Sequence, residues 1–175
     1  MADDAGFAAF VRANSGSLFK TAYLLTGNAD RAEELLQDTL ARLYPRWDRV
    51  LAADTPLAYV RRCVANAFVN SRRRRSTQDV SLHCLPDLPD EANLAERVAD
   101  RGLLWQLLGS LPDRQRAALV MRYFHDQPDA QIAAAIGCRS ATVRSLISRG
   151  IATMRAEAAA AVEQAARETS QGTQS

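Results

Sequence analysis

An all-α fold, with two small helical domains joined by a flexible linker, is the architecture that these 175 residues predict. Alanine is abundant, prolines are few, and apolar residues recur at helical spacing, which favours helices over strands. The net charge alternates: +4 over residues 1–75, −4 over 76–111, +4 over 112–155 and −2 over 156–175. Two basic segments separated by an acidic one are typical of two polyanion-binding modules joined by a spacer.

The N-terminal domain, residues 1–75, begins with apolar residues between Phe7 and Leu25 that suggest two short helices, ended by Thr26-Gly27-Asn28. Asp30 with Glu33 resembles a capping box for the next helix. One apolar face of that helix is expected to contain Leu36, Leu40, Leu43, Trp47 and Val50.

Four polar side chains lie off that apolar face, near the start of the same helix: Glu33, Glu34, Gln37 and Asp38. Acidic residues in a first turn usually stabilise the helix dipole. A docking surface for a basic partner helix is the alternative, and the spacing favours neither over the other.

Asp54-Thr55-Pro56 predicts a helix start, because a capping side chain precedes proline at the first helical position. Leu57, Val60, Val64 and Phe68 are expected to form its buried stripe. The rest of its surface, with the basic run that follows, contains Arg61, Arg62, Asn66, Asn70, Arg72, Arg73, Arg74 and Arg75. Such residues hydrogen-bond bases and phosphates. A solvated helix with a basic tail is the alternative, but four consecutive arginines favour nucleic acid and a steep salt dependence.

Residues 76–101 contain two prolines, six acidic residues and little periodicity before Leu94, and they are expected to form an acidic flexible linker.

The three cysteines are far apart and odd in number, which argues against a disulfide framework. His83-Cys84 lacks the spacing of a metal site, so we predict no metal and no cofactor. With neither a signal peptide nor an apolar run of about 18 residues, a soluble, cytoplasmic protein without membrane insertion is expected.

The C-terminal domain, residues 102–156, reads as a short helix followed by a helix-turn-helix. Pro112 and Pro128 each open a helix, Gly137 supplies a left-handed residue that ends one, and Ser140 caps the next. The last helix is expected to bury Val143, Ile147, Ile151 and Met154. Residues 157–175 form an alanine-rich tail that extends this helix before a disordered end.

The outward face of the helix-turn-helix is rich in Arg, Ser and Thr, a composition that suits reading of the DNA major groove. Its members are Arg139, Ser140, Thr142, Arg144, Ser145, Ser148 and Arg149. A helix pair that serves packing alone is the alternative, but an Arg- and Ser-rich face favours DNA.

From about residue 7 to 156 the chain resembles the extracytoplasmic-function (ECF) group of sigma-70 family RNA polymerase sigma factors. AEELLQDT from Ala32 resembles the acidic region 2.2 motif, and PLAYVRR from Pro56, with the arginine run, resembles regions 2.3 and 2.4. LPDRQR from Leu111 resembles the entry to region 4, and the segment from Ile132 to Ser145 resembles region 4.2. The order and spacing of the segments are more specific than any one of them.

The resemblance implies a non-enzymatic factor that binds bacterial core RNA polymerase and promoter DNA. Glu33, Glu34, Gln37 and Asp38 would dock on the β′ clamp helices, and apolar residues of the C-terminal domain would meet the β flap. The −10 element and its extruded base would be contacted by Arg61, Arg62, Asn66, Asn70 and the arginines from Arg72 to Arg75. The set from Arg139 to Arg149 would face the −35 element. An anti-sigma factor is a usual partner in the family.

The chain departs from the family pattern at Asn70, often Asp, and at Leu146, usually Arg, as well as at Ala58-Tyr59, Gln127-Pro128 and Ala141. These changes lie in the segments that the resemblance assigns to the −10 and −35 contacts. A stand-alone helix-turn-helix regulator is the second hypothesis, although it would not need the acidic docking patch. An enzyme is disfavoured because no phosphate loop, metal set or nucleophile–base pair is present.

Overall fold

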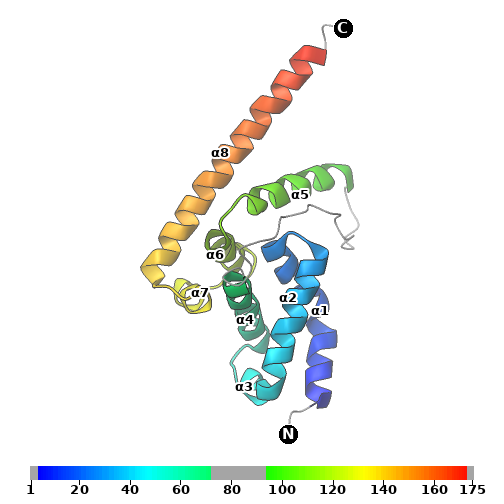
Figure 1. Cartoon of the computed structure of the whole chain (residues 1–175), viewed down its shortest axis with the longest axis vertical. Coiled ribbons are helices and arrows are strands. Elements are labelled where there is room, and N and C mark those ends of the chain that lie inside the picture. The colour runs from blue at the N-terminus through cyan, green and yellow to red at the C-terminus, as the bar shows by residue number, and fades with distance from the viewer. Residues whose placement is uncertain (1–3, 72–93, 173–175) are drawn as a thin grey trace.

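The computed structural model describes residues 4–71 and 94–172, with side chains described for 4–71 and 102–167. These residues form helices and no strand (Figure 1). The elements are α1 (Asp4–Thr26), α2 (Ala29–Leu43), the 3₁₀ turn η1 (Tyr44–Arg46), α3 (Trp47–Leu51), α4 (Pro56–Ser71), α5 (Leu94–Gly109), α6 (Asp113–Tyr123), α7 (Asp129–Ile136) and α8 (Ser140–Gly172). The arginines at 72–75, His83, Cys84 and most of the predicted linker lie outside the described residues.

Helix α1 is continuous, which corrects the prediction of two short helices. The helix runs through Asn14, Ser15 and Gly16 without a break. The Asn14 side-chain amide donates to the carbonyl of Phe10 at 2.8 Å, one turn earlier. The rings of Phe7 and Phe10 pack edge-on against Trp47, and this contact anchors the first half of α1.

Helix α2 has a different cap and a different end from those predicted. Asn28, not Asp30, is the N-cap, and its side-chain oxygen accepts from the Arg31 backbone N–H at 2.9 Å. The expected single helix also breaks at η1, because Pro45 cannot donate a backbone hydrogen bond. Trp47 and Val50 still reach the core, from α3.

Helix α4 begins at Pro56 as predicted, and the carbonyl of Thr55 accepts its first hydrogen bond from Tyr59 at 3.0 Å. Val60, Val64 and Phe68 are buried as expected, while Leu57 is only half-buried. Helix α5 begins at Leu94, so residues 94–101 are helical although the sequence assigned them to the flexible linker.

Helices α6, α7 and α8 form the predicted helix-turn-helix with its preceding helix. Gly137 ends α7 in the left-handed conformation, with φ of 65°. The carbonyl of Arg139 accepts from Val143, so Ser140 lies in the first turn of α8 instead of capping it. The buried stripe of α8 is shifted from the predicted one: Val143 and Leu146 are buried, and Ile147, Ile151 and Met154 are half-buried.

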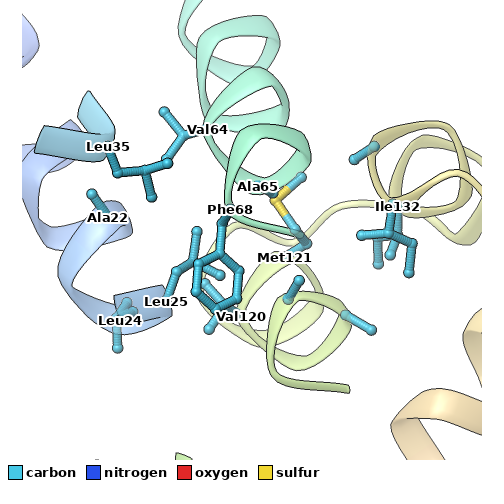
Figure 2. Close-up of a cluster of buried hydrophobic side chains, with 14 of the residues drawn as sticks. Ala22, Leu24, Leu25, Leu35, Val64, Ala65, Phe68, Val120, Met121 and Ile132 are labelled. Atoms are coloured by element: carbon cyan, nitrogen blue, oxygen red, sulfur yellow. The ribbon is translucent and has the colours of Figure 1, made fainter. Parts of the chain in front are cut away.

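A single hydrophobic core joins the two domains (Figure 2). In Figure 2, α4 lies between the helices of the N-terminal domain and those of the C-terminal domain, with Phe68 beside Leu25 and Val120. Trp105 of α5 packs edge-on against Tyr23 of α1, with ring centroids 4.5 Å apart. The sequence predicted two helical domains joined by a linker, and in the structure these domains pack against each other.

Beyond the core, α8 projects as a rod whose far end carries the C-terminus (Figure 1). The alanine-rich tail is helical as expected, and the helix continues through 170–172, where a disordered end had been predicted. Side chains from 159 to 167 are exposed. No helix in the described part of the chain has a stretch that is apolar enough to cross a bilayer.

Candidate polymerase and nucleic-acid interfaces

The acidic patch of α2 is formed by Glu33, Glu34, Gln37 and Asp38, which are all exposed on one side of the helix. The opposite side is anchored in the core by Leu35, Leu36 and Leu40. Within the patch the Gln37 amide donates to Glu33 at 3.2 Å, and Asp38 lies 3.7 Å from Arg42. Exposed pairs of this kind contribute little to folding stability. The patch is therefore a solvent-facing, mainly negative surface on a fixed helix.

The predicted −10 residues on α4 do not all face solvent. Arg61 is half-buried, donates to the hydroxyl of Ser17 on α1, and has its pKa lowered by burial. Arg62 lies over the ring of Tyr59 at 5.1 Å from the centroid. Asn70 donates to the carbonyl of Asn66 at 2.9 Å.

Asn66 also contacts the helix-turn-helix. Its side-chain amide donates to the carbonyl of Ala135, in the last turn of α7, at 2.7 Å. The predicted −10 residues of α4 thus have different partners: Arg62 and Asn70 contact residues of α4 itself, whereas Asn66 also binds α7. Sequence periodicity did not indicate this contact, because it joins residues 69 positions apart.

Polar contacts also join the two domains. Their interface lies between α1 and α4 on one side and α6, α7 and the turn that connects these two helices on the other, and is called the seam. The guanidinium of Arg116, a buried residue of α6, donates to the carbonyl of Leu25 at 2.8 Å and lies over the ring of Phe68. The Thr21 hydroxyl lies 3.0 Å from Nε2 of His125. Burial, reinforced by the nearby charge of Arg61, lowers the pKa of His125 to about 4, so the ring is neutral at pH 7.

The predicted −35 residues form one outward surface at the start of α8. Arg139, Ser140, Arg144, Ser145, Ser148 and Arg149 are exposed, and Thr142 is half-buried. Ser145 donates to the carbonyl of Thr142 at 2.9 Å, and Arg149 donates to the carbonyl of Ser145 at 3.2 Å. The surface is strongly basic and lies on a helix whose other side is anchored by Val143 and Leu146.

Sequence reasoning missed Asp129, the first residue of α7, as a partner of this surface. Its carboxylate pairs with Arg122 of α6 and lies 3.6 Å from Nε of Arg144. Acidic composition at a helix start was visible in the sequence, but its two arginine partners depend on how α6, α7 and α8 pack. Asp129 therefore engages one of the arginines of the predicted −35 surface.

An open pocket of about 470 Å³ lies beside these arginines. It is lined by Arg122, Arg144, Ile147, Ser148, Ile151, Ala152 and Arg155. Its lining combines three arginines with the apolar side chains of Ile147, Ile151 and Ala152. Among the described residues, no group of three or more His, Cys, Asp or Glu side chains is placed to hold a metal ion.

Comparisons with known proteins match both domains. The family model for sigma-70 region 2 matches residues 10–78, and that for sigma-70 region 4 matches residues 101–154. The chain is 34% identical to an RNA polymerase sigma-E factor of Streptomyces coelicolor, over 86% of this chain and 85% of the relative. It is 28% identical to the ECF RNA polymerase sigma factor SigL of Mycobacterium tuberculosis, over 79% and 80% of the two chains.

Two solved structures share the fold. The sigma factor RpoE of Bartonella quintana, in complex with the anti-sigma factor NepR, has a TM-score of 0.66 at 22% identity, over 86% of this chain and 94% of that one. CnrH in complex with the cytosolic domain of CnrY has a TM-score of 0.60 at 18% identity, over 90% of each chain. From the two matched regions and the 34% identity to a relative that is covered over 85% of its length, the protein belongs to the ECF group of the sigma-70 family.

Proposed function

We propose that the chain is a sigma factor that binds core RNA polymerase and directs it to promoters through −10 and −35 elements. One observation carries the proposal: sigma-70 regions 2 and 4 occur in this order within one short chain. Bacterial core polymerase and promoter DNA are accordingly its partners. The polymerase supplies all the chemistry, the factor itself is not an enzyme, and it acts in the cytoplasm, where polymerase and DNA are found.

The acidic patch of α2 docks on the β′ clamp helices of the polymerase. Support comes from the exposure of all four side chains on a helix that the core holds in place. Complementary charge speeds encounter and fixes the register of a docked helix. The apolar residues of the C-terminal domain meet the β flap.

The −10 element is bound by α4 and the arginine run that follows it. Arg61, Arg62, Asn66 and Asn70 supply donors that suit bases and phosphates on an opened strand. The outward surface of α8 contacts the −35 element in the major groove. Arg144 and Arg149 are its exposed cations, and Ser145 and Ser148 its adaptable hydroxyl groups.

An anti-sigma protein is a further proposed partner. The two proteins with the matched fold were each solved in a complex, the sigma factor RpoE with the anti-sigma factor NepR and CnrH with the cytosolic domain of CnrY.

Co-elution with core polymerase tests the proposal. The Glu34→Lys/Asp38→Lys variant should lose the complex in size-exclusion chromatography, because it reverses the charge of the patch. The Glu157→Lys/Glu163→Lys variant changes the net charge equally on the exposed far part of α8 and should still co-elute. If the wild type forms no complex yet binds a specific duplex tightly by itself, the protein is a conventional helix-turn-helix regulator instead.

A further inference from the structure

The C-terminal end of α7, where the turn of the helix-turn-helix begins, is capped by side chains from other helices. A helix leaves its last carbonyl groups without partners inside the helix. Here Asn66 of α4 donates to the carbonyl of Ala135 at 2.7 Å. Arg114 of α6 donates through Nη2 to the carbonyls of Ile136 and Gly137, at 2.8 and 3.1 Å. These two hydrogen bonds from Arg114 lie within the C-terminal domain and are called the brace.

Arg114 departs from local preference at its own position and satisfies it where its side chain ends. It lies in the first turn of α6, where the helix dipole disfavours a cation. Its guanidinium reaches the C-terminal end of α7, where the dipole favours a cation and charge-assisted hydrogen bonds are stronger than neutral ones. The residue is exposed, so solvent weakens these bonds and their loss should leave the rest of the fold intact. A residue placed against local preference is a candidate for a functional role.

The turn that the brace holds leads directly into α8. The backbone amides of Gly137 and Cys138 both donate to the carbonyl of Ala133, which closes the end of α7. Two residues after Cys138, at Ser140, α8 begins, and most of the predicted −35 surface lies on its first turns (Figure 1). Because so few residues separate the two helices, a shift at the end of α7 changes the direction in which α8 leaves the turn.

We propose that Arg114 is a positioning residue for −35 recognition: its guanidinium holds the end of α7, and thereby the angle at which α8 presents its outward surface to DNA. The brace itself is independent of the proposed function, whereas its consequence for DNA rests on that function. An arginine that bound a phosphate would strengthen binding to every sequence alike. The brace acts on base discrimination instead, because side chains that read bases must be held in place closely.

Hydrogen exchange in the free, full-length chain tests the brace without DNA. Arg114→Met removes the donors and keeps much of the side-chain stem, so the amides of Gly137 and Cys138 should exchange roughly threefold to tenfold faster. Arg114→Lys keeps a cationic donor and should restore part of the protection. Arg167→Met, on the exposed far part of α8, is the matched control and should change neither amide. Wild-type exchange rates in Arg114→Met would overturn the proposal, as would equal acceleration of all amides in α6 and α7.

The consequence for recognition is tested with the holoenzyme and a promoter library randomised across the −35 element. Arg114→Met should reduce discrimination between selected and unselected sequences roughly threefold to tenfold. Its salt slope should stay unchanged, and Arg114→Lys should recover part of the discrimination. Arg167→Met should discriminate as the wild type does.

Two results in this assay would overturn the positioning role. A salt slope lower by about one unit, with full discrimination, would make Arg114 a phosphate contact. A loss of binding that is equal for all sequences would make it a stabilising residue only. A wild-type holoenzyme that selects no −35 sequence would instead count against the sigma-factor function, and the exchange rates would then decide whether the brace exists.

Discussion

Asp129 holds two arginines of the C-terminal domain, Arg122 and Arg144, on one carboxylate. Arg144 is otherwise well exposed, with a side chain at 75% of full exposure. An arginine side chain whose guanidinium is already held by a carboxylate would lose less rotamer freedom on binding DNA. It would, however, have to break its ion pair with that carboxylate to bind. If Arg144 contacts the −35 element as proposed, we expect Asp129 to set both the strength of that contact and the placement of the guanidinium.

Removal of the Asp129 charge should strengthen DNA binding and weaken discrimination. For Asp129→Asn we expect a tighter complex of the holoenzyme with duplex DNA and a salt slope steeper by about one unit, because Arg144 becomes free to neutralise a phosphate. Asp126→Asn is the matched control, since it removes the same charge from an exposed neighbouring position. Equal effects of both changes would show that only net charge matters.

Truncation of Arg144 gives the complementary test. If this side chain reads a base, Arg144→Ala should cost roughly 1–3 kcal/mol of promoter binding and relax the preference at one position of the −35 element. Competition binding with promoter variants measures both. A loss that is equal for all sequences would assign Arg144 to a phosphate.

His125 makes the seam sensitive to pH. Its pKa falls from 6.5 to about 4 because the ring is buried beside Arg61 and, further off, Lys20. The unfolded state therefore binds a proton that the folded state excludes, so the contribution of His125 to the free energy of unfolding is complete above pH 6.5 and declines as pH falls toward 4. Between these pH values, the free energy of unfolding should fall less steeply in His125→Gln than in the wild type. Denaturant titrations give the two slopes, and identical slopes would contradict the assignment.

Among the elements, the turn of the helix-turn-helix depends on one glycine. Gly137 has φ of 65°, a conformation that costs other residues roughly 1–2 kcal/mol. Gly137→Ala should lower the melting temperature, whereas Gly102→Ala, inside α5 with open space around it, should raise stability by roughly 0.5–1 kcal/mol. Thermal unfolding by circular dichroism measures both, and a neutral Gly137→Ala would mean that the turn relaxes to another conformation.

Elements with strong local signals could be predicted from the sequence. Thr55-Pro56 gave the start of α4, Gly137 gave the end of α7, and family motifs gave the order of the two domains, which the matched family models confirm. Local sequence signals predicted the wrong residue where two neighbouring residues could fill the same structural role. Asn28 caps α2 in place of Asp30, and the shift of the α8 stripe to Leu146 depends on packing that periodicity does not specify.

The candidate site could be predicted only as separate surfaces. Exposure of the acidic patch and of the α8 face follows from helical periodicity, because the buried residues of each helix point the other way. The Asn66–Ala135 contact joins residues far apart in sequence and could not be predicted, and the residue roles themselves stay predictions.

At the scale of the whole molecule, Phe68 belongs to both domains at once. It is 8% exposed and packs with the cation of Arg116 as well as with Leu25 and Val120. Phe68→Ala should cost roughly 3–5 kcal/mol, since the cavity lies where the domains meet. In calorimetry we expect one cooperative transition in the wild type. Val162→Ala, on the exposed part of α8, should change little. Two separate transitions in the wild type would contradict a shared core.

A core shared in this way also restricts how the chain can evolve. Leu25 and Phe68 come from the region 2 match, and Val120 and Met121 come from the region 4 match, so neither half can change these residues without regard to the other. In a hybrid of this N-terminal half with the C-terminal half of a relative, the side chains at the interface of the halves would not fit each other. This would hold even if each half kept its contacts with its promoter element. The recombination of promoter specificities is therefore limited by packing between the halves as well as by their DNA contacts.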